Sequence, residues 1–287
     1  ANCGWDFRYD EAEVADMSAF VPHVAEGVNG YAAEEFRCQS RTGDGARDLT
    51  ESNTAHIHAI GLTAEDYMRM ALDSAQIIWS PRSNISLYGF TAQVTTFKRF
   101  GGTIALGTDW TYSGSANTIR ELACADQYNR NNLGGFFSDK QLHDMATVNA
   151  AIATGNQALI GSLDSGKLAD IAIYAAKGTG QFHRNVIDAD NLSTLLVIKG
   201  GEAMYGRPAL VEALGESCDN LTVCGESRVV CTTREFGTSF AEIKGLVQDG
   251  QDDAYDAIFC DPIPAGEPTC TPIRIGEFTG APAAGDS

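Results

Sequence analysis

Residues 103–110, Thr-Ile-Ala-Leu-Gly-Thr-Asp-Trp, place a carboxylate directly after a short apolar run that is typical of a buried β-strand. The same order recurs upstream, where one apolar run leads to His23 and another leads to His58. Stretches with helical spacing separate the runs, and this alternation is the pattern of βα units around a parallel sheet. Because parallel strands end at one edge of their sheet, these side chains are expected to meet there.

The runs predict four strands, at residues 19–24, 55–60, 76–79 and 103–106. A helix is predicted after Thr63, whose hydroxyl can cap the helix start together with Asp66 three residues later. Ser138 and Gln141 form the same kind of capping pair and predict a second helix. After about residue 160 the pattern changes to short strands with glycines, which indicates a separate β-rich region.

The overall charge restricts the partners that this chain can bind. Among 287 residues, 38 are acidic and 20 are basic, which gives a formal net charge of −18. Such a surface repels phosphate backbones and anionic lipid, so we expect neither nucleic acid nor membrane partners. Every apolar run is shorter than the ~20 residues of a membrane span, and the first residues lack the features of a signal peptide.

The eight cysteines favour disulfides and an exported, oxidising location, periplasmic or secreted. Five of them lie in the last quarter of the chain: Cys218, Cys224, Cys231, Cys260 and Cys270. A structural zinc knot is the alternative, but the chain has no Cys-x-x-Cys pair and no histidine after His183.

Histidines and carboxylates at the strand ends are the candidates for chemistry. His23 is a possible metal ligand, and Glu26 lies three residues later on the same strand-to-helix turn as a possible proton shuttle. Asp109 follows the strand at residues 103–106, where it could ligate a metal and accept a proton from water. Taken singly, each of these could be an ordinary surface or turn residue.

His56 and His58 form a His-x-His pair, which on a strand directs both side chains to one face and is a familiar way of holding a metal. His58 lies 51 residues before Asp109, which leaves room for two βα units of ~30 residues each. The pair therefore belongs to a late strand of the sheet, and His56 is interpreted as incidental.

Four stretches together resemble the metal-dependent amidohydrolase superfamily, in the branch that includes cytosine and guanine deaminases and triazine hydrolases. In the order of the barrel strands five to eight, they are His23-Val24-Ala25-Glu26-Gly27, His58-Ala59-Ile60-Gly61-Leu62-Thr63, Ser80-Pro81-Arg82-Ser83-Asn84 and Leu106-Gly107-Thr108-Asp109. The run from Gly166 to Asp170, followed by Lys199-Gly200-Gly201-Glu202, is similar to the β-sandwich strands that follow the barrel in such enzymes.

The resemblance implies an α/β fold: the C-terminal half of a TIM-like (β/α)8 barrel, an adjoining small β-sandwich domain and a disulfide-rich C-terminal extension. The expected parts are residues 1–160 for strands five to eight, 161–214 for the β-sandwich, 215–275 for the cysteine-rich extension and 276–287 for a flexible tail.

The resemblance also implies roles for the strand-end residues. His23, His58 and Asp109 become metal ligands, with Asp109 also the general base, Glu26 the proton shuttle and His58 alternatively the group that polarises a carbonyl. The expected cofactor is one or two divalent metal ions, with zinc preferred and iron or manganese as alternatives.

Two departures from the family pattern affect the predicted function. Deaminases of this branch often carry a histidine just before the Pro-x-Ser-Asn turn, where this chain has Trp79. The His-x-His of strand one would lie upstream of Ala1. We therefore expect the N-terminal half of the barrel, on a separate chain or a cleaved fragment, to complete the site, within a possible higher oligomer.

Trp79, Arg82 and Trp110 are predicted to contact a small-molecule substrate, because aromatic and guanidinium groups near Asp109 suit a planar or anionic ligand. Tyr88 and Tyr112 are further aromatic candidates, and Arg120 a second arginine; packing or surface salt bridges are the alternatives for all of them.

Three functional hypotheses follow. The leading one is hydrolysis of a non-peptide C–N bond, in an amide, cyclic amide or amidine, by metal-activated water. The first alternative is deamination of an aminated heterocycle, and the second is a noncatalytic scaffold or binding subunit that retains the fold.

Overall fold

The computed structural model describes residues 3–248, 255, 259–260 and 262–273. The chain forms two compact units, one made of Ala1–Gly161 with Pro268–Ser287 and the other of Ser162–Glu267. The predicted flexible tail at residues 276–287 lies outside the described residues.

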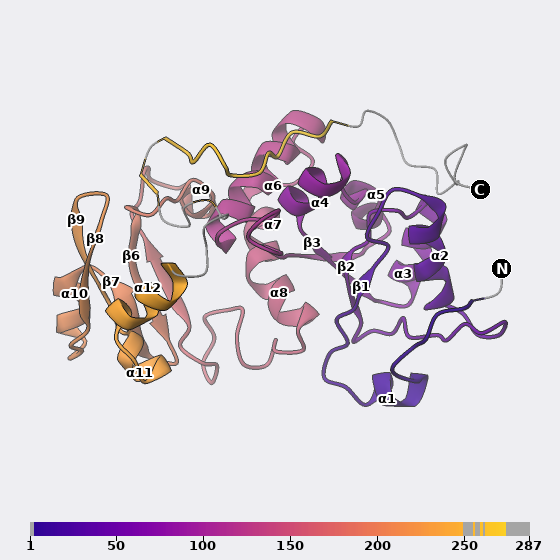
Figure 1. The fold of residues 1–287 in the computed structure, drawn as a ribbon, viewed down its shortest axis with the longest axis horizontal. Helices are drawn as coiled ribbons and strands as arrows, with labels where there is room; N and C mark the ends of the chain where they lie inside the picture. The colour runs from indigo at the N-terminus through magenta and orange to yellow at the C-terminus, as the bar shows by residue number, and fades with distance from the viewer. Residues whose placement is uncertain (1–2, 249–254, 256–258, 261, 274–287) are drawn as a thin grey trace. The chain divides into compact units, whose positions relative to one another are not determined.

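A parallel sheet of four strands organises the first unit (Figure 1). The strands lie in chain order: β1 His23–Val24, β2 Ala55–His58, β3 Gln76–Trp79 and β4 Thr103–Leu106. The predictions for β3 and β4 are confirmed residue for residue. Residues 19–24 are strand only at their end, with Phe20 forming an isolated bridge to Thr54.

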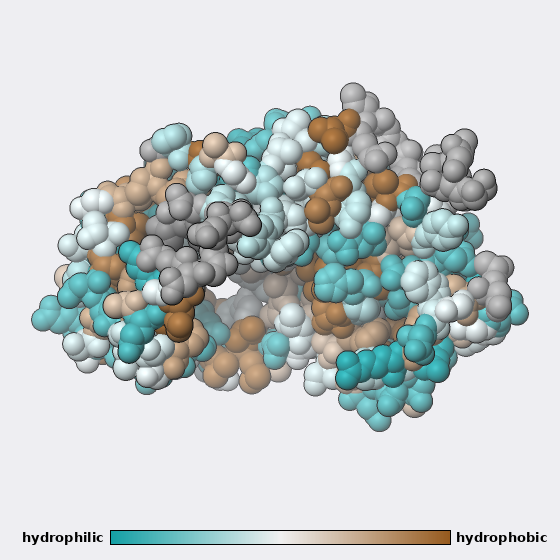
Figure 2. Space-filling view, viewed as in Figure 1, coloured by the Kyte–Doolittle hydropathy of each residue, from teal (hydrophilic) through white to brown (hydrophobic). Residues whose placement is uncertain are grey.

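Helices alternate with these strands, as the periodicity predicted. They are α1 Glu11–Ala15, α2 Gly30–Cys38, α3 Ala64–Leu72, α4 Pro81–Tyr88, α5 Val94–Arg99, α6 Thr118–Asn132, α7 Asp139–Ala146 and α8 Val148–Ala153. Thr63 caps α3 with Asp66 and Ser138 caps α7 with Gln141, so both predicted capping boxes are confirmed. Hydrophilic residues gather over α1, as Figure 2 shows, in keeping with its acidic sequence.

The core of this unit lies on both faces of the sheet. On one face, Ile77, Trp79 and Ile104 are all 1% exposed or less. On the other face, Ala105 of β4 packs against Ala153 of α8, and both are buried. Burial on both faces is typical of parallel sheets, because the connecting helices cover them. The strands are thereby held as a rigid support for the residues at their ends.

The second unit contains one antiparallel sheet of five strands in the order β5-β6-β7-β9-β8. Its strands are β5 Ile171–Tyr174, β6 Thr194–Lys199, β7 Glu202–Gly206, β8 Asp219–Val223 and β9 Glu226–Val230. Its helices are α9 Phe182–Ile187, α10 Pro208–Ala213, α11 Thr232–Phe236 and α12 Phe240–Gln248.

This sheet divides the chain differently from the sequence prediction. The expected boundary between a β-sandwich at 161–214 and an extension at 215–275 falls inside the sheet, because β9 pairs with β7. Over the described part of this unit the strands form a single sheet and not two packed ones. The cysteines of residues 215–267 lie on or beside β8 and β9, so they fasten this sheet instead of a separate extension.

All eight cysteines are paired, which agrees with the expectation of disulfides over a zinc knot. The pairs are Cys3–Cys38, Cys124–Cys270, Cys218–Cys231 and Cys224–Cys260. In the part of the chain that the structure describes, no helix combines the length and apolar character needed to cross a membrane.

Residues 268–273, which we call the C-terminal strap, return to the first unit and bind both ends of α4. The guanidinium of Arg82 donates to the carbonyl of Pro268, and the N–H of Ile273 donates to the carbonyl of Gly89 over 3.1 Å. The disulfide from Cys270 to Cys124 joins the strap to α6 across a sequence separation of 146 residues. The strap therefore links α4 to α6.

We expect the double variant Cys124→Ser/Cys270→Ser to lower the free energy of unfolding of the first unit by roughly 2–5 kcal/mol, because a long loop is no longer closed in the unfolded chain. Denaturant titration with limited proteolysis measures the effect, and new cleavage within residues 268–273 is expected. Cys218→Ser/Cys231→Ser, in the other unit, is the control and should leave the strap protected. An unchanged unfolding midpoint with an intact strap would contradict the assigned role.

Candidate active site

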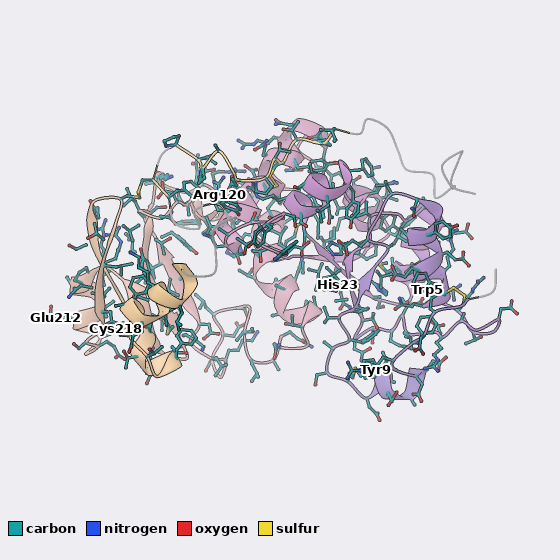
Figure 3. All side chains as sticks on the ribbon, in the orientation of Figure 1. Trp5, Tyr9, His23, Arg120, Glu212 and Cys218 are labelled. Carbon is teal, nitrogen blue, oxygen red and sulfur yellow. A yellow bond between two sulfur atoms is a disulfide. The ribbon has the colours of Figure 1, made fainter. Side chains whose placement is uncertain are left out.

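Four predicted residues meet at the C-terminal edge of the parallel sheet. His23 begins β1, Glu26 follows β1, His58 ends β2 and Asp109 follows β4; Figure 3 marks His23 beside β1. His58 lies at the centre: its Nε2 is 3.4 Å from Glu26 Oε2, its Nδ1 is 3.9 Å from Asp109 Oδ2, and its ring centroid is 5.2 Å from that of His23. The predicted catalytic roles stay predictions, but the predicted residues are brought together.

Left-handed backbone turns aim these side chains. Ala25, His58, Ala59 and Asp109 have φ values of 55°, 74°, 50° and 58°, in a region that residues other than glycine rarely adopt. The turn at His58 and Ala59 ends β2 two residues before the predicted end at residue 60. Such conformations cost of order 1–3 kcal/mol each and cluster at functional sites.

The two histidines of the His-x-His pair do not share a site. His56 is fully buried and packs edge-on against Phe36 of α2, with ring centroids 5.5 Å apart. Burial lowers the pKa of His56 to about 3, so its ring is neutral. His58 instead contacts the strand-end residues, which agrees with the interpretation of His56 as incidental.

Two partners fix the Glu26 carboxylate. Tyr88, at the end of α4, donates its hydroxyl to Oε1 over 2.9 Å, while Oε2 faces His58. Burial, with the hydrogen bond to Glu26, raises the pKa of Tyr88 to about 12, so this phenol remains a donor at neutral pH. Glu26 is therefore held in one orientation although a third of its side chain, 32%, is exposed.

Asp109 is oriented by its own loop. Its Oδ1 accepts the N–H of Trp110 over 2.7 Å, which leaves Oδ2 directed toward His58. The side chain is 17% exposed, so a small molecule or water can reach this carboxylate. It is placed to accept a proton at the edge of the sheet.

The chemistry of the donors fits a divalent metal. Two imidazoles and a carboxylate, from His23, His58 and Asp109, are the nitrogen and oxygen ligands that zinc takes in catalytic sites. Within the described residues, however, these three do not bring one ligand atom each within 4.8 Å of one another. The cluster that does is Cys3, Glu34 and Cys38, whose two sulfurs form a disulfide and are not thiolates.

Of the three predicted substrate-binding residues, two are corrected by their burial. Trp79 is fully buried and donates its Nε1–H to Thr91 Oγ1 over 2.7 Å. Arg82 is 3% exposed, and its guanidinium donates to Ser115 and to the carbonyls of Pro268 and Arg120. Both side chains therefore form hydrogen bonds inside the protein and are not exposed to a substrate. Trp110, in contrast, is 63% exposed beside Asp109, where a substrate could contact it.

A buried clamp around Arg82 holds the loop that carries Asp109. Arg82 Nε donates to Ser115 Oγ over 2.6 Å, and Ser115 Oγ donates to Glu121 Oε2. The N–H of Ser115 also donates to the carbonyl of Thr108 over 3.0 Å, next to Asp109. Burial raises the pKa of Glu121 to about 7, even though Arg82 lowers it.

Two residues that support the site had no predicted role, and a third had a different one. Asn84 Oδ1 lies 3.0 Å from His58 Nδ1, and Glu35 accepts the N–H of Ala25 over 2.8 Å. Tyr88 was considered for the substrate cavity but instead holds Glu26. Asn84 and Tyr88 are four residues apart, a helical spacing that could have revealed a shared face; for Glu35 the sequence carries no such signal.

Parallel βα units with histidines and carboxylates at their strand ends are the arrangement found in barrel enzymes, whose sites lie at the C-terminal edge of the sheet. The sequence pattern of the amidohydrolase family matches residues 17–204. The chain therefore belongs to the amidohydrolase family, and the resemblance drawn from its motifs is confirmed.

Relatives and solved structures agree with this membership. Over 119 residues the chain is 33% identical to a 5-methylthioadenosine/S-adenosylhomocysteine deaminase of Teredinibacter turnerae, covering 40% of this chain and 27% of the relative. Escherichia coli guanine deaminase shares the fold with a TM-score of 0.56 at 19% identity, covering 69% and 50% of the two chains. A zinc complex of atrazine chlorohydrolase from Arthrobacter aurescens gives 0.55 at 20% identity, covering 68% and 46%. The chain thus spans half or less of the length of each of these relatives.

The Glu121 clamp predicts a pH dependence of stability. Because the folded pKa of about 7 lies above the ordinary 4.5, the folded state binds the proton more tightly, and this stabilisation is present below pH 4.5 and lost as pH rises through 7. Glu121→Gln, which resembles the protonated acid, should match the wild type near pH 4.5 and exceed its free energy of unfolding by roughly 3 kcal/mol above pH 7.

Denaturant titrations between pH 4.5 and 8 measure the difference. Glu212→Gln, on α10 of the other unit, serves as the control and should run parallel to the wild type. A constant difference between Glu121→Gln and wild type across this range would contradict the assigned pKa.

Proposed function

We propose that this chain carries half of the active site of a metal-dependent hydrolase that cleaves a non-peptide C–N bond. The observation that carries this proposal is the position of His58 between a possible proton shuttle, Glu26, at 3.4 Å and a possible base, Asp109, at 3.9 Å. Both carboxylates reach one imidazole at the edge of a parallel sheet, where a substrate can approach. Membership of the amidohydrolase family supports the same reaction class.

Asp109 and Glu26 are proposed to carry out the two proton transfers of the reaction. Asp109 Oδ2 takes the proton from the attacking water, and Glu26 delivers a proton to the departing nitrogen. His58 lies between them, and its proposed role is to hold the metal or, as the alternative, to polarise the carbonyl or ring carbon that water attacks. Tyr88 keeps Glu26 turned toward His58.

A divalent metal would be held by His23, His58 and Asp109. When bound, it lowers the pKa of water so that water can act as a nucleophile near neutral pH. Zinc is the preferred ion, since solved structures with this fold, an adenosine deaminase of Xanthomonas campestris among them, were crystallised with zinc. Iron and manganese suit the same donor atoms, and one or two ions are proposed.

Two substrate classes share this chemistry. The first is an amide, cyclic amide or amidine. The second, deamination of an aminated heterocycle, is favoured by the deaminase name of the relative at 33% identity. The exposed rings of Trp110 and Tyr112, whose centroids are 4.7 Å apart, support a planar substrate beside Asp109.

The N-terminal half of the barrel is proposed to complete the site, whether it belongs to the same polypeptide, a fragment or a separate chain. The carbonyls of Pro22 and Val24 accept from Ile57 of β2 and from Ala59 just after it, so the peptide groups of His23 face the opposite edge. Among the described strands, none pairs with that edge. A parallel strand added there would bring its own C-terminal residues next to His23.

The disulfides and the open sheet edges support two lesser proposals. Four disulfides favour folding in an oxidising, extracytoplasmic compartment. The open edges of the sheet are also compatible with assembly into a higher oligomer, which the same partner chains would mediate.

We expect Asp109→Asn to lower kcat by roughly 100- to 10,000-fold, because the base that accepts the proton from water is lost. The assay uses natively purified, zinc-loaded protein with a panel of adenosine, 5-methylthioadenosine, guanine and simple cyclic amides. Ammonia release from the first three, against ring opening of the amides, separates the two substrate classes. Asp144→Asn, on α7, is the matched control. No turnover of any compound, or full activity of Asp109→Asn, would reject the hydrolase proposal.

Intact mass and metal analysis of natively purified material test the completed site. A single longer polypeptide, or a second one that co-purifies, is expected to accompany about one or two equivalents of metal. Recovery of this chain alone, stable and free of metal, would reject the split site and favour the noncatalytic scaffold.

A further inference from the structure

One helix contacts both members of the Glu26–His58 pair. Asn84 and Tyr88 lie four residues apart on α4 and so project from the same face of the helix. Asn84 Oδ1 is 3.0 Å from His58 Nδ1, and the hydroxyl of Tyr88 is 2.9 Å from Glu26 Oε1. Neither residue is a metal ligand or an acid–base group in the reaction proposed above.

Asn84 determines which ring nitrogen of His58 carries the proton. It is fully buried, and its Nδ2 donates to Thr91 Oγ1 over 3.1 Å. Its oxygen therefore faces His58, and an amide oxygen only accepts, so the proton lies on Nδ1. Asp109 Oδ2, at 3.9 Å, is a second acceptor on the same side of the ring. The lone pair of Nε2 is left facing Glu26.

Tyr88 determines how the Glu26 carboxylate is turned. With Oε1 accepting the phenol, Oε2 is the oxygen that faces Nε2 of His58 at 3.4 Å. A glutamate that is 32% exposed would otherwise sample several rotamers. The phenol therefore limits the orientations of the group that has to deliver a proton.

The helix itself is held at both ends. Pro81 begins α4 at a position that suits proline, and Gly89 ends it in the left-handed conformation with φ 69°. The C-terminal strap bonds to Arg82 at the first turn and to the carbonyl of Gly89 just beyond the last. A helix fixed in this way can orient the side chains that it contacts.

We propose that Asn84 and Tyr88 are positioning residues, which hold His58 in the tautomer protonated on Nδ1 and turn Glu26 toward its Nε2. The inference rests on the proposed function, because it takes Glu26 as the proton shuttle and His58 as the site residue that Glu26 faces. It adds α4 as the element that orients both groups, and it predicts different defects for the two substitutions.

Nitrogen NMR of the metal-free, natively purified protein tests whether Asn84 sets the tautomer of His58, and it requires no turnover. In spectra recorded over a pH series, and read where the nitrogen shifts report a neutral ring, the wild type should show the Nδ1-protonated tautomer of His58. Asn84→Leu removes the acceptor, so the proton should move to Nε2, where Glu26 is the nearer carboxylate. Asn84→Asp retains an acceptor oxygen and should keep the proton on Nδ1, which also covers the case in which Asn84→Leu does not fold.

Steady-state kinetics with the best substrate of the panel test whether Tyr88 orients the Glu26 carboxylate. Tyr88→Phe deletes only the hydroxyl, and we expect kcat to fall by roughly 10- to 100-fold with KM within about 2-fold, as for other residues that orient a catalytic group. Tyr31→Phe, at an exposed position on α2, is the matched control and should leave both constants unchanged. If the panel gives no turnover, the rotamer of Glu26 in Tyr88→Phe, read by side-chain NMR couplings, replaces kcat as the measurement.

The outcomes separate this inference from the proposed function. An Nδ1-protonated His58 in Asn84→Leu, an Nε2-protonated His58 in the wild type or in Asn84→Asp, or an unaltered Glu26 and kcat in Tyr88→Phe, would overturn the positioning role. Absence of turnover in the wild type would reject the proposed hydrolase while the tautomer and rotamer measurements still decide the roles of Asn84 and Tyr88.

Discussion

Parallel hydrogen bonding between β1, β2, β3 and β4 is the constraint on which the site depends. Because each strand runs in the same direction, the chain leaves the sheet at the same edge four times, and each exit carries its own side chains there. The registers that pair Val24 with His58, and Trp79 with Leu106, keep these exits level. A shift of one residue in β2 would place Ile57 at the strand end in place of His58 and would remove the imidazole from the site.

The sheet alone does not aim the side chains, and the elements after each strand supply what is missing. Glu35 of α2 holds the turn at Ala25, α4 contacts Glu26 and His58, and the Arg82–Ser115–Glu121 clamp fixes the loop after β4. Apart from the exposed bond between Tyr88 and Glu26, these contacts are buried or partly buried, where hydrogen bonds are costly to lose. They explain how four non-glycine residues remain in left-handed conformations at strand ends, since strain of this kind persists only when neighbouring contacts determine the backbone.

The sequence predicted those parts of the molecule that local pattern determines. Apolar runs located β3 and β4, and capping pairs located the starts of α3 and α7. The positions of His23, Glu26, His58 and Asp109 followed from the rule that strand ends converge. Trp79 and Arg82 were misjudged because strands and helices buried on both faces give no alternation from which the direction of a side chain can be inferred. The extent of the second sheet was missed because β7 and β9 pair across an interval that contains α10 and β8.

The open side of β4 shows how the molecule treats an edge of its sheet. Gly107 donates to the carbonyl of Trp79, so the peptide groups of Ile104, an odd number of residues earlier, face away from β3. The carbonyl of Ile104 accepts instead from the side chain of Asn149 on α8, over 2.8 Å. A side-chain amide satisfies one carbonyl but supplies no ladder, and it can be displaced by the N–H of a further parallel strand. The edge at β4 is thus covered in part and still able to accept a strand. At β1, His23 is exposed, and among the described strands none pairs with its open side. Closure of the barrel would therefore affect His23 most, by burying the one candidate ligand that the present contacts leave loosely held.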